Sequence, residues 1–319
     1  MNDKRIYIIS KVCRHGTMWA FALLILFCAS CQRQSRVQPR RSMYYWQTTL
    51  AFDTLQRQFL SLHRITRLYV RYFDVVNDEQ GRPVPNATLG VVDTVPKGIE
   101  VVPVVFVMPQ CLRGDVGQLA SRIVRRIGQM SRAHAIPQAD EVQIDCDWTR
   151  STRKAFRQFM KVVCDEAHRR GLRVSVTIRL HQLAQDPPPA DRGVLMMYNT
   201  GDPRDLHCDK PILDVRAARP YLRHLSAYRM PLVAAYPVFG WRLLTRAQRF
   251  VGILHYEGEY PILDGDSVIV RRPSSGDIEA ARQALYSRRP GIHDEIVLFD
   301  LSLRNISRYS PAEFERMYR

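Results

Sequence analysis

The feature that most constrains the fold is a regular alternation between strand-length apolar runs and amphipathic helical stretches. Parallel β/α units have this pattern, because each strand is buried on both faces and each helix covers the sheet with one apolar side. The helical stretches are clearest at residues 115–133, 152–170 and 217–228. The strand-length runs are at 44–50, 65–75, 99–109, 141–148, 172–183, 193–199, 230–240 and 294–303. Eight such runs predict an α/β protein folded as a closed (β/α)₈ TIM-type barrel.

Two segments interrupt the alternation. Residues 77–98 are rich in glycine, proline and asparagine, which predicts a loop or short hairpin after the second strand. Residues 260–272 read as a hairpin that turns at Asp264-Gly265, and a helix is expected at 277–287. We therefore predict a barrel over residues 43–319 that carries a small α+β insertion, residues 241–290, between its seventh and eighth strands.

The N-terminal residues 1–30 have the pattern of an export signal. Basic residues precede the apolar run 18–27, which is shorter than the ~20 residues that span a bilayer as a helix. The following Cys28-Ala29-Ser30-Cys31 resembles the lipobox of bacterial lipoproteins, which implies that Cys31 is lipidated. A plain signal peptide or an uncleaved short anchor is the alternative. Either interpretation predicts a location in the bacterial cell envelope, and lipidation predicts a membrane-anchored lipoprotein that faces the periplasm.

The chain is strongly basic, and removal of residues 1–30 lowers its formal net charge only from +16 to +13. Residues 31–42 contain four arginines and are expected to be a tether near an anionic lipid surface. Acidic glycans are also compatible partners for a basic protein. No nucleic-acid-binding motif accompanies the charge, so we expect no nucleic-acid partner. Nothing in the sequence indicates an oligomeric state.

The cysteines and histidines do not predict a metal site. Cys111, Cys146, Cys164 and Cys208 show no C-x-x-C spacing, and His181 has no histidine at ligand spacing. We expect no metal and no cofactor. An exported protein can form disulfide bonds, and the sequence does not determine which cysteines would pair. Cys146 and Cys164 fit the pattern of buried free thiols better.

Candidate chemistry lies where the fourth and fifth predicted strands end. Alternate residues of a strand share a face, which groups Asp145 with Asp147 and Arg179 with His181 on the polar faces of these strands. Charged groups inside a barrel are costly unless they satisfy one another or a ligand. The pattern therefore predicts either a site at the C-terminal mouth of the barrel or a buried Asp–Arg pair that only organises the core.

The order of these motifs resembles family 18 of the chitinase-like glycoside hydrolases. The family pattern D-x-x-D-x-D-x-E is similar to "VQIDCDWT" (142–149), M-x-Y-D to "MMYN" (196–199), and L-G-x-P-x-Y-G to "LVAAYPVFG" (232–240). The phrases "RLYVRYFDV" and "TIRLHQL" also resemble bacterial envelope lipoproteins. The resemblance implies a divergent glycosidase-like barrel that binds a glycan.

Two residues depart from the family pattern. Thr149 stands at the position of the catalytic glutamate, and Asn199 stands where the family has an aspartate beside the N-acetyl group. A threonine hydroxyl is too weak an acid to protonate a glycosidic oxygen at neutral pH. Catalysis would then depend on Asp147, with a pKa raised by Asp145, and on Asp74 as a second carboxylate. A loop-start aspartate that caps backbone N–H groups is the alternative for Asp74.

Aromatic side chains gather at the predicted strand ends, where sugar-binding barrels stack pyranose rings. Tyr45, Tyr236 and Phe239 are among them, although aromatics at strand ends can equally be core packing. The predicted glycan-binding residues are Arg179, His181, Tyr198, Asn199, Trp46 and Trp241.

Three functions remain open from the sequence. The leading hypothesis is a lipid-anchored, extracytoplasmic barrel that binds an envelope or imported glycan, with hydrolysis of that glycan left open. The second is a lectin-like or assembly lipoprotein without catalysis. The third is a protein that binds an anionic surface through its arginines.

Overall fold

Eight parallel strands close into a barrel in the computed structural model, which describes residues 38–256 and 258–319. β1 pairs with both β14 and β3, and this double pairing closes the sheet. Around the barrel the order is β1-β14-β10-β9-β8-β7-β6-β3. The strands are β1 (Arg40–Tyr45), β3 (Arg67–Asn77), β6 (Glu100–Val107), β7 (Glu141–Asp145), β8 (Arg173–Arg179), β9 (Arg192–Met196), β10 (Leu232–Pro237) and β14 (Glu295–Phe299).

The predicted (β/α)₈ barrel is confirmed, and each predicted strand overlaps an observed one. The first strand begins earlier than predicted, so residues 40–42 lie in β1 instead of in a tether. Their basic character had suggested a tether. In the structure, however, Arg41 donates to the Glu315 carboxylate at 2.8 Å, near the C-terminus. That pairing lets an arginine sit at the start of a barrel strand.

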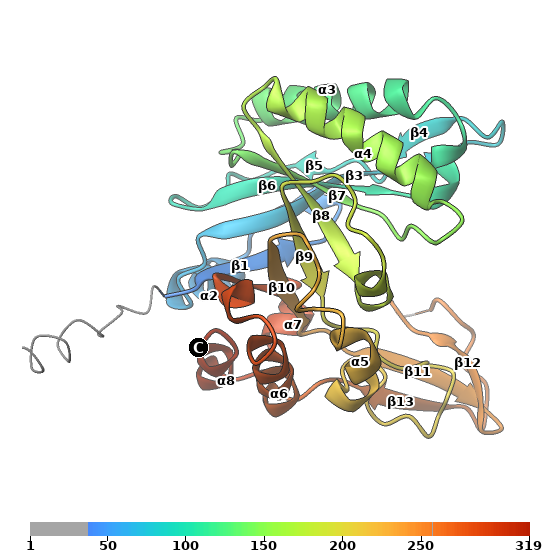
Figure 1. Cartoon of the computed structure of the whole chain (residues 1–319). Coiled ribbons are helices and arrows are strands. Elements are labelled where there is room, and N and C mark those ends of the chain that lie inside the picture. Colours follow the sequence, from blue (N-terminus) through green and yellow to red (C-terminus); the bar gives the residue numbers. More distant parts are fainter. Residues whose placement is uncertain (1–37, 257) are drawn as a thin grey trace, which may run out of the picture. The chain divides into compact units, whose positions relative to one another are not determined.

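Helices form the outer layer of the barrel (Figure 1). α3 and α4 lie side by side along one flank, and their apolar faces are buried against the strands. Asp115 caps α3 by accepting a hydrogen bond from the Gln118 backbone N–H at 2.9 Å. The helices are α2 (Thr54–Leu62), α3 (Val116–Ala133), α4 (Arg153–His168), α5 (Val215–Leu222), α6 (Ser275–Tyr286), α7 (Leu303–Ile306) and α8 (Pro311–Met317). Shorter 3₁₀ turns are η1 (Pro109–Arg113), η2 (Leu180–Ala184) and η3 (Pro290–His293).

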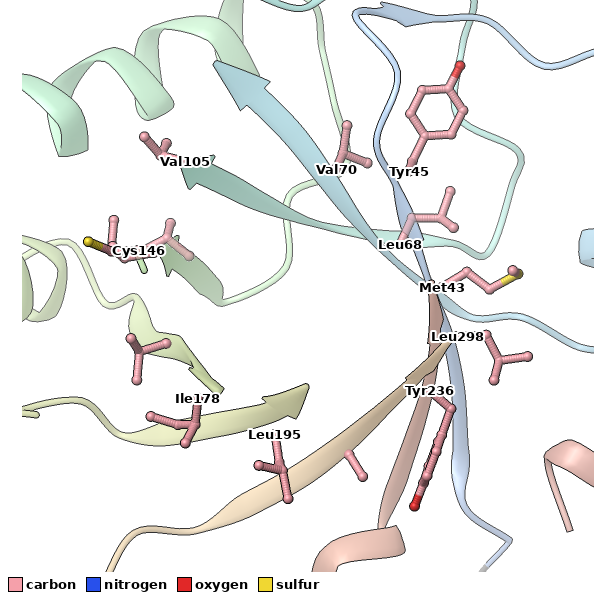
Figure 2. Close-up of a cluster of buried hydrophobic side chains, with 14 of the residues drawn as sticks. Met43, Tyr45, Leu68, Val70, Val105, Cys146, Ile178, Leu195, Tyr236 and Leu298 are labelled. Atoms are coloured by element: carbon pink, nitrogen blue, oxygen red, sulfur yellow. The ribbon is translucent and has the colours of Figure 1, made fainter. Parts of the chain in front are cut away.

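The core has two layers because alternate residues of each strand point inward and outward. The outward residues, such as Leu68, Val105 and Ile178, pack towards the helices (Figure 2). The inward residues, such as Tyr44 and Met196, fill the barrel interior. Cys111, Cys146 and Cys164 are buried free thiols, as predicted for the last two.

Two interruptions of the barrel differ in character. β4 (Pro83–Asn86) pairs antiparallel with the end of β3, which confirms the predicted hairpin, and β2 (Thr49–Leu50) pairs with β5 (Gly90–Val91). Between β10 and β14, a three-stranded antiparallel sheet consists of β11 (Trp241–Arg246), β12 (Arg249–Ile253) and β13 (Ser267–Arg271).

The insertion between strands seven and eight is smaller than predicted. The hairpin predicted for residues 260–272 is wrong, because β13 pairs with β11 and not with the residues just before it. The predicted turn is present, with Gly265 at a φ of 83°. α6 packs against the barrel helices α5 and α8. It is therefore a helix of the barrel layer, and the inserted element is the sheet.

A buried ion-pair network closes the N-terminal end of the barrel. Arg192 donates to Glu295 at 2.7 Å and to Glu141 at 2.8 Å, and Arg67 contacts Glu141 at 3.1 Å. Tyr69 also donates to Glu295 at 3.0 Å. Because these four charges and the Tyr69 hydroxyl come from inward-facing side chains near the starts of the strands, they satisfy one another inside the barrel.

The predicted signal (1–30) and lipidated Cys31 lie outside the described residues. Within residues 38–256 and 258–319, no helix has the length and apolar character to cross a membrane.

Candidate functional site

The C-terminal mouth of the barrel brings two predicted aspartates and one arginine together. Asp145 ends β7, Asp147 follows two residues later, and Arg179 ends the neighbouring strand β8. Arg179 donates from Nη2 to Asp145 at 3.0 Å and from Nε to Asp147 at 2.5 Å. One guanidinium therefore binds both carboxylates.

The two aspartates differ in burial. The Asp145 side chain is 5% exposed and also accepts a hydrogen bond from the Thr177 hydroxyl at 2.5 Å, whereas the Asp147 side chain is 55% exposed. Burial raises the pKa of Asp145, although Arg179 and Thr177 oppose the shift. Burial also disfavours the charge of Arg179, but the two carboxylates outweigh it and raise the guanidinium pKa. The cation is therefore permanent.

The residue at the position of the expected acid turns into the loop before α4. Thr149 is exposed, and its hydroxyl lies 2.8 Å from the Ser151 hydroxyl. The preceding Trp148 is buried and stacks on Phe156 of α4, with ring centroids 5.7 Å apart. The loop therefore offers a hydroxyl, and no carboxyl group, at this position of the mouth.

Asp74 is held by an arginine that the sequence analysis did not select. Arg71 donates through both its Nε and Nη2 to the Asp74 carboxylate, and Asp74 is buried. A regular strand would point residues 71 and 74 to opposite faces, but a register shift between Arg71 and Phe73 inserts one extra residue. Bulges give no clear signal in a single sequence, so only the structure reveals this pair.

The aromatic residues at the mouth form one cluster with a partly exposed surface. Trp46 and Tyr198 both pack on Phe299, with centroids 5.4 and 5.8 Å away. Trp241 joins the cluster through Phe239, at 6.1 Å. All five side chains are half-buried. Phe299 was missed because it lies within an apolar run that reads as core.

Other predicted residues lie at the rim or away from it. His181 is exposed in η2, and its pKa is lowered by partial burial and by Arg179, against the effect of Asp147. Asn199 is exposed and has a φ of 55°. Tyr45 and Tyr236 are fully buried on the outer side of the strands, so their assignment to the aromatic mouth cluster is wrong.

Tyr198 connects the aromatic cluster to the charged group. Burial raises the pKa of Tyr198, and the nearby Asp145 and Asp147 also raise it. Arg179 opposes this shift. The mouth thus combines flat apolar surface with fixed charge in one place. Such a combination suits recognition of a sugar, whose ring faces are apolar and whose hydroxyls are polar.

Comparison with solved structures identifies the barrel type. A chitinase from Chromobacterium violaceum shares 13% identity at a TM-score of 0.58, covering 88% of this chain and 98% of that one. The Bacillus cereus spore cortex-lytic enzyme SleL shares 13% identity at a TM-score of 0.55, and the match covers 88% of this chain and 73% of that one. The family 18 chitinase ChiB of Flavobacterium johnsoniae shares 11% identity at a TM-score of 0.53, and the match covers 88% of this chain and 93% of that one.

These similarities show that the chain has the (β/α)₈ barrel fold of the family 18 chitinases. No family model matches the sequence. No curated protein matches it either. The predicted chitinase-like barrel is thus confirmed at the level of the fold.

Proposed function

We propose that this chain binds a glycan at the C-terminal mouth of its barrel and does not hydrolyse it. The observation that carries the proposal is the pairing of Arg179 with both Asp145 and Asp147 at 3.0 and 2.5 Å. A general acid must direct its proton at the glycosidic oxygen, and here Arg179 already occupies Oδ1 of each carboxylate. Thr149 offers no replacement.

The other carboxylate considered for catalysis is similarly bound. Arg71 neutralises Asp74, and its guanidinium also lies 5.6 Å from the centre of the Trp46 ring. Arg71 therefore fixes a ring of the aromatic cluster while it pairs with the carboxylate. Positioned rings without a free acid favour binding over bond cleavage.

The glycan class is supported by the barrel's relatives in structure. A chitinase domain from Ostrinia furnacalis with a TM-score of 0.51 was crystallised with an oligomer of N-acetylglucosamine. We therefore expect the ligand to be an oligosaccharide of the cell envelope or one imported from outside. Trp46, Tyr198 and Trp241 are the side chains expected to contact its rings.

The binding test is calorimetry with a panel of N-acetylated and acidic oligosaccharides. Trp46→Ala and Trp241→Ala should each weaken binding about 5- to 10-fold, because one stacked aromatic ring contributes roughly 1 kcal/mol. Tyr286→Ala is the matched control, since Tyr286 is also a partly exposed aromatic but lies at the end of α6. Equal losses in all three variants would argue against the mouth as the binding site.

The catalytic test measures reducing ends released from the same oligosaccharides. The wild type and Asp147→Asn should both release none above the buffer blank. Turnover by the wild type that disappears in Asp147→Asn would refute the non-catalytic proposal and restore Asp147 as the acid.

The proposal includes a lipid anchor at Cys31 and an extracytoplasmic location facing the periplasm. Support comes from the sequence, in which a basic segment, a short apolar run and Cys28-Ala29-Ser30-Cys31 follow one another. Labelling of the expressed protein with a fatty acid should mark the wild type and fail for Cys31→Ala. Label that persists in Cys31→Ala would rule out this anchor.

A further inference from the structure

The outer flank of the barrel carries a second charged surface that the mouth does not use. It is formed by α3 and α4, which lie side by side and are joined by a hydrogen bond from the Ser121 hydroxyl to Glu166 at 3.1 Å. We call this surface the basic face and define it by Arg122, Arg125 and Arg132 of α3 and Lys154, Arg157 and Lys161 of α4.

The charges of the basic face are not neutralised by neighbouring acids. Of the ion pairs formed among the described residues, none includes any of these six side chains. α3 contains no acidic residue, and α4 has its two acids, Asp165 and Glu166, only in its last turn. By contrast, the inward-facing Arg67 and Arg192 pair with glutamates. Five of the six side chains that define the basic face belong to exposed residues, and Arg157 is half-buried.

The start of α4 shows that this charge is not arranged for helix stability. Arg153 and Lys154 occupy its first turn, where the helix dipole disfavours cations, and Thr152 makes no capping bond with its side chain. α6 and α8 instead begin with a capping box and an acidic residue. The same chain thus follows the capping rules at α3, α6 and α8 and departs from them at the start of α4.

We infer that the basic face binds an acidic polysaccharide, a chain of sugars that carry carboxylate, sulfate or phosphate groups. Three of its exposed residues, Arg122, Arg125 and Arg132, are arginines, whose planar guanidinium matches such oxyanions with two hydrogen bonds. The half-buried Arg157 already donates to the Pro187 carbonyl. The exposed charges lie on two helices that run side by side, which suits a linear polyanion. The inference concerns a surface outside the mouth and holds whether or not the mouth binds a neutral glycan.

Continuity with the mouth favours a glycan as the occupant. The loop between β7 and α4 carries Asp147 and Thr149 at the mouth and Arg150, which is exposed, immediately before α4. This loop therefore joins the charged group of the mouth directly to the first turn of α4.

A lipid bilayer is the competing occupant, and the exposed side chains argue against it. Surfaces that dock into membranes combine basic residues with exposed large apolar ones. The large hydrophobic side chains exposed on the described part of the chain include none from α3 or α4. The nearest in sequence is Met108, which precedes η1.

The test compares alginate, a polymer of carboxylated sugars, with neutral dextran, using the full-length protein at low and high salt. The variant Arg122→Gln/Arg125→Gln/Lys154→Gln/Lys161→Gln should bind alginate about 30-fold more weakly than the wild type at low salt. That factor follows from roughly 0.5 kcal/mol for each of four exposed charge pairs and 1.4 kcal/mol for each factor of ten. Added salt should remove the difference.

A matched control carries the same change of charge elsewhere. Lys97→Gln/Arg219→Gln/Arg223→Gln/Arg229→Gln replaces four exposed residues that form no ion pair with a described residue. It should retain alginate binding within about a factor of two, since screened distant charges contribute little. Equal weakening in both variants would mean that only net charge matters, and would overturn the inference.

Two further arms separate the remaining outcomes. Vesicles of phosphatidylglycerol that bind while alginate does not would overturn the inference in favour of a membrane. The basic-face variant should weaken alginate binding more than Trp46→Ala does, about 30-fold against the 5- to 10-fold expected for one aromatic ring at the mouth. Loss of alginate binding in Trp46→Ala but not in the basic-face variant would assign the polyanion to the mouth and also overturn it.

Discussion

The pairing of Arg179 with two aspartates makes a quantitative prediction for the variant Arg179→Met. Methionine keeps much of the apolar volume of the arginine stem but removes the guanidinium. The change leaves Asp145, whose side chain is 5% exposed, without its cationic partner at 3.0 Å. Asp147 loses its contact as well, but its side chain is 55% exposed and gains water instead.

The expected loss of stability comes from Asp145 and has an upper bound. Breaking a buried ion pair by removing one partner typically costs about 3–5 kcal/mol. The aspartate can escape part of this penalty by taking up a proton, which at pH 7 costs about 4 kcal/mol, since pH 7 is roughly three units above its ordinary pKa. We therefore expect Arg179→Met to lower the free energy of unfolding by about 3 kcal/mol at pH 7.

The pH dependence gives the sign that distinguishes this explanation from simple loss of packing. Burial already raises the pKa of Asp145 in the folded protein, and removal of Arg179 raises it further. A folded state that binds more protons than the unfolded state loses stability as pH rises above the unfolded pKa of about 3.9. The deficit of Arg179→Met should consequently shrink to about 1.5 kcal/mol or less at pH 5.

Urea denaturation followed by circular dichroism at pH 7 and pH 5 measures both quantities. Asp147→Asn is the matched control and should cost less than about 1 kcal/mol at either pH, because its pair is exposed. Adding Asp145→Asn to Arg179→Met should recover part of the stability at pH 7. The reasoning is refuted if the Arg179→Met deficit is the same at both pH values, or no larger than that of Asp147→Asn.

Two further predictions concern the opposite end of the barrel and its wall. Burial opposes the charge of Glu295, but Arg192 at 2.7 Å contributes to a net lowering of its pKa. Glu295→Gln should therefore cost about 3 kcal/mol at pH 7 and much less at pH 3, because a lowered pKa contributes stability above the unfolded pKa that is lost in acid. In the wall, a methyl group on Gly193 would lie 2.7 Å from Leu232, so Gly193→Ala should lower the free energy of unfolding by about 1–3 kcal/mol. Gly114→Ala meets no atom within 4 Å and should be nearly neutral, and equal melting temperatures for the two alanine variants would contradict the packing argument.

The two ends of the barrel use buried charge differently. At the N-terminal end, Glu141 and Glu295 are buried, and each contacts arginines from other strands. At the C-terminal end, Arg179 holds one buried and one exposed aspartate beside half-buried aromatic rings. The second arrangement places fixed charge beside partly exposed aromatic rings, at the end of the barrel where active sites occur.

The sequence by itself determined the fold class, the order of the strands and the residues of the charged group at the mouth. Repeated apolar runs of strand length require burial on both faces, and a period of two along β7 and β8 points Asp145 and Arg179 inward. These are local properties of the chain, so they can be read without coordinates. The same local signals overextended the predicted tether as far as Ser42, which lies in β1, and the predicted insertion as far as α6.

Only the tertiary structure decided how the charges are used. A single guanidinium that binds Asp145 and Asp147, a bulge that turns Arg71 towards Asp74, and the packing of Trp46 and Phe299 all join residues from different strands. Such contacts depend on register and barrel closure, which no pattern along one strand contains. The sequence therefore located a polar mouth, and the fold determined that its carboxylates are bound by arginines.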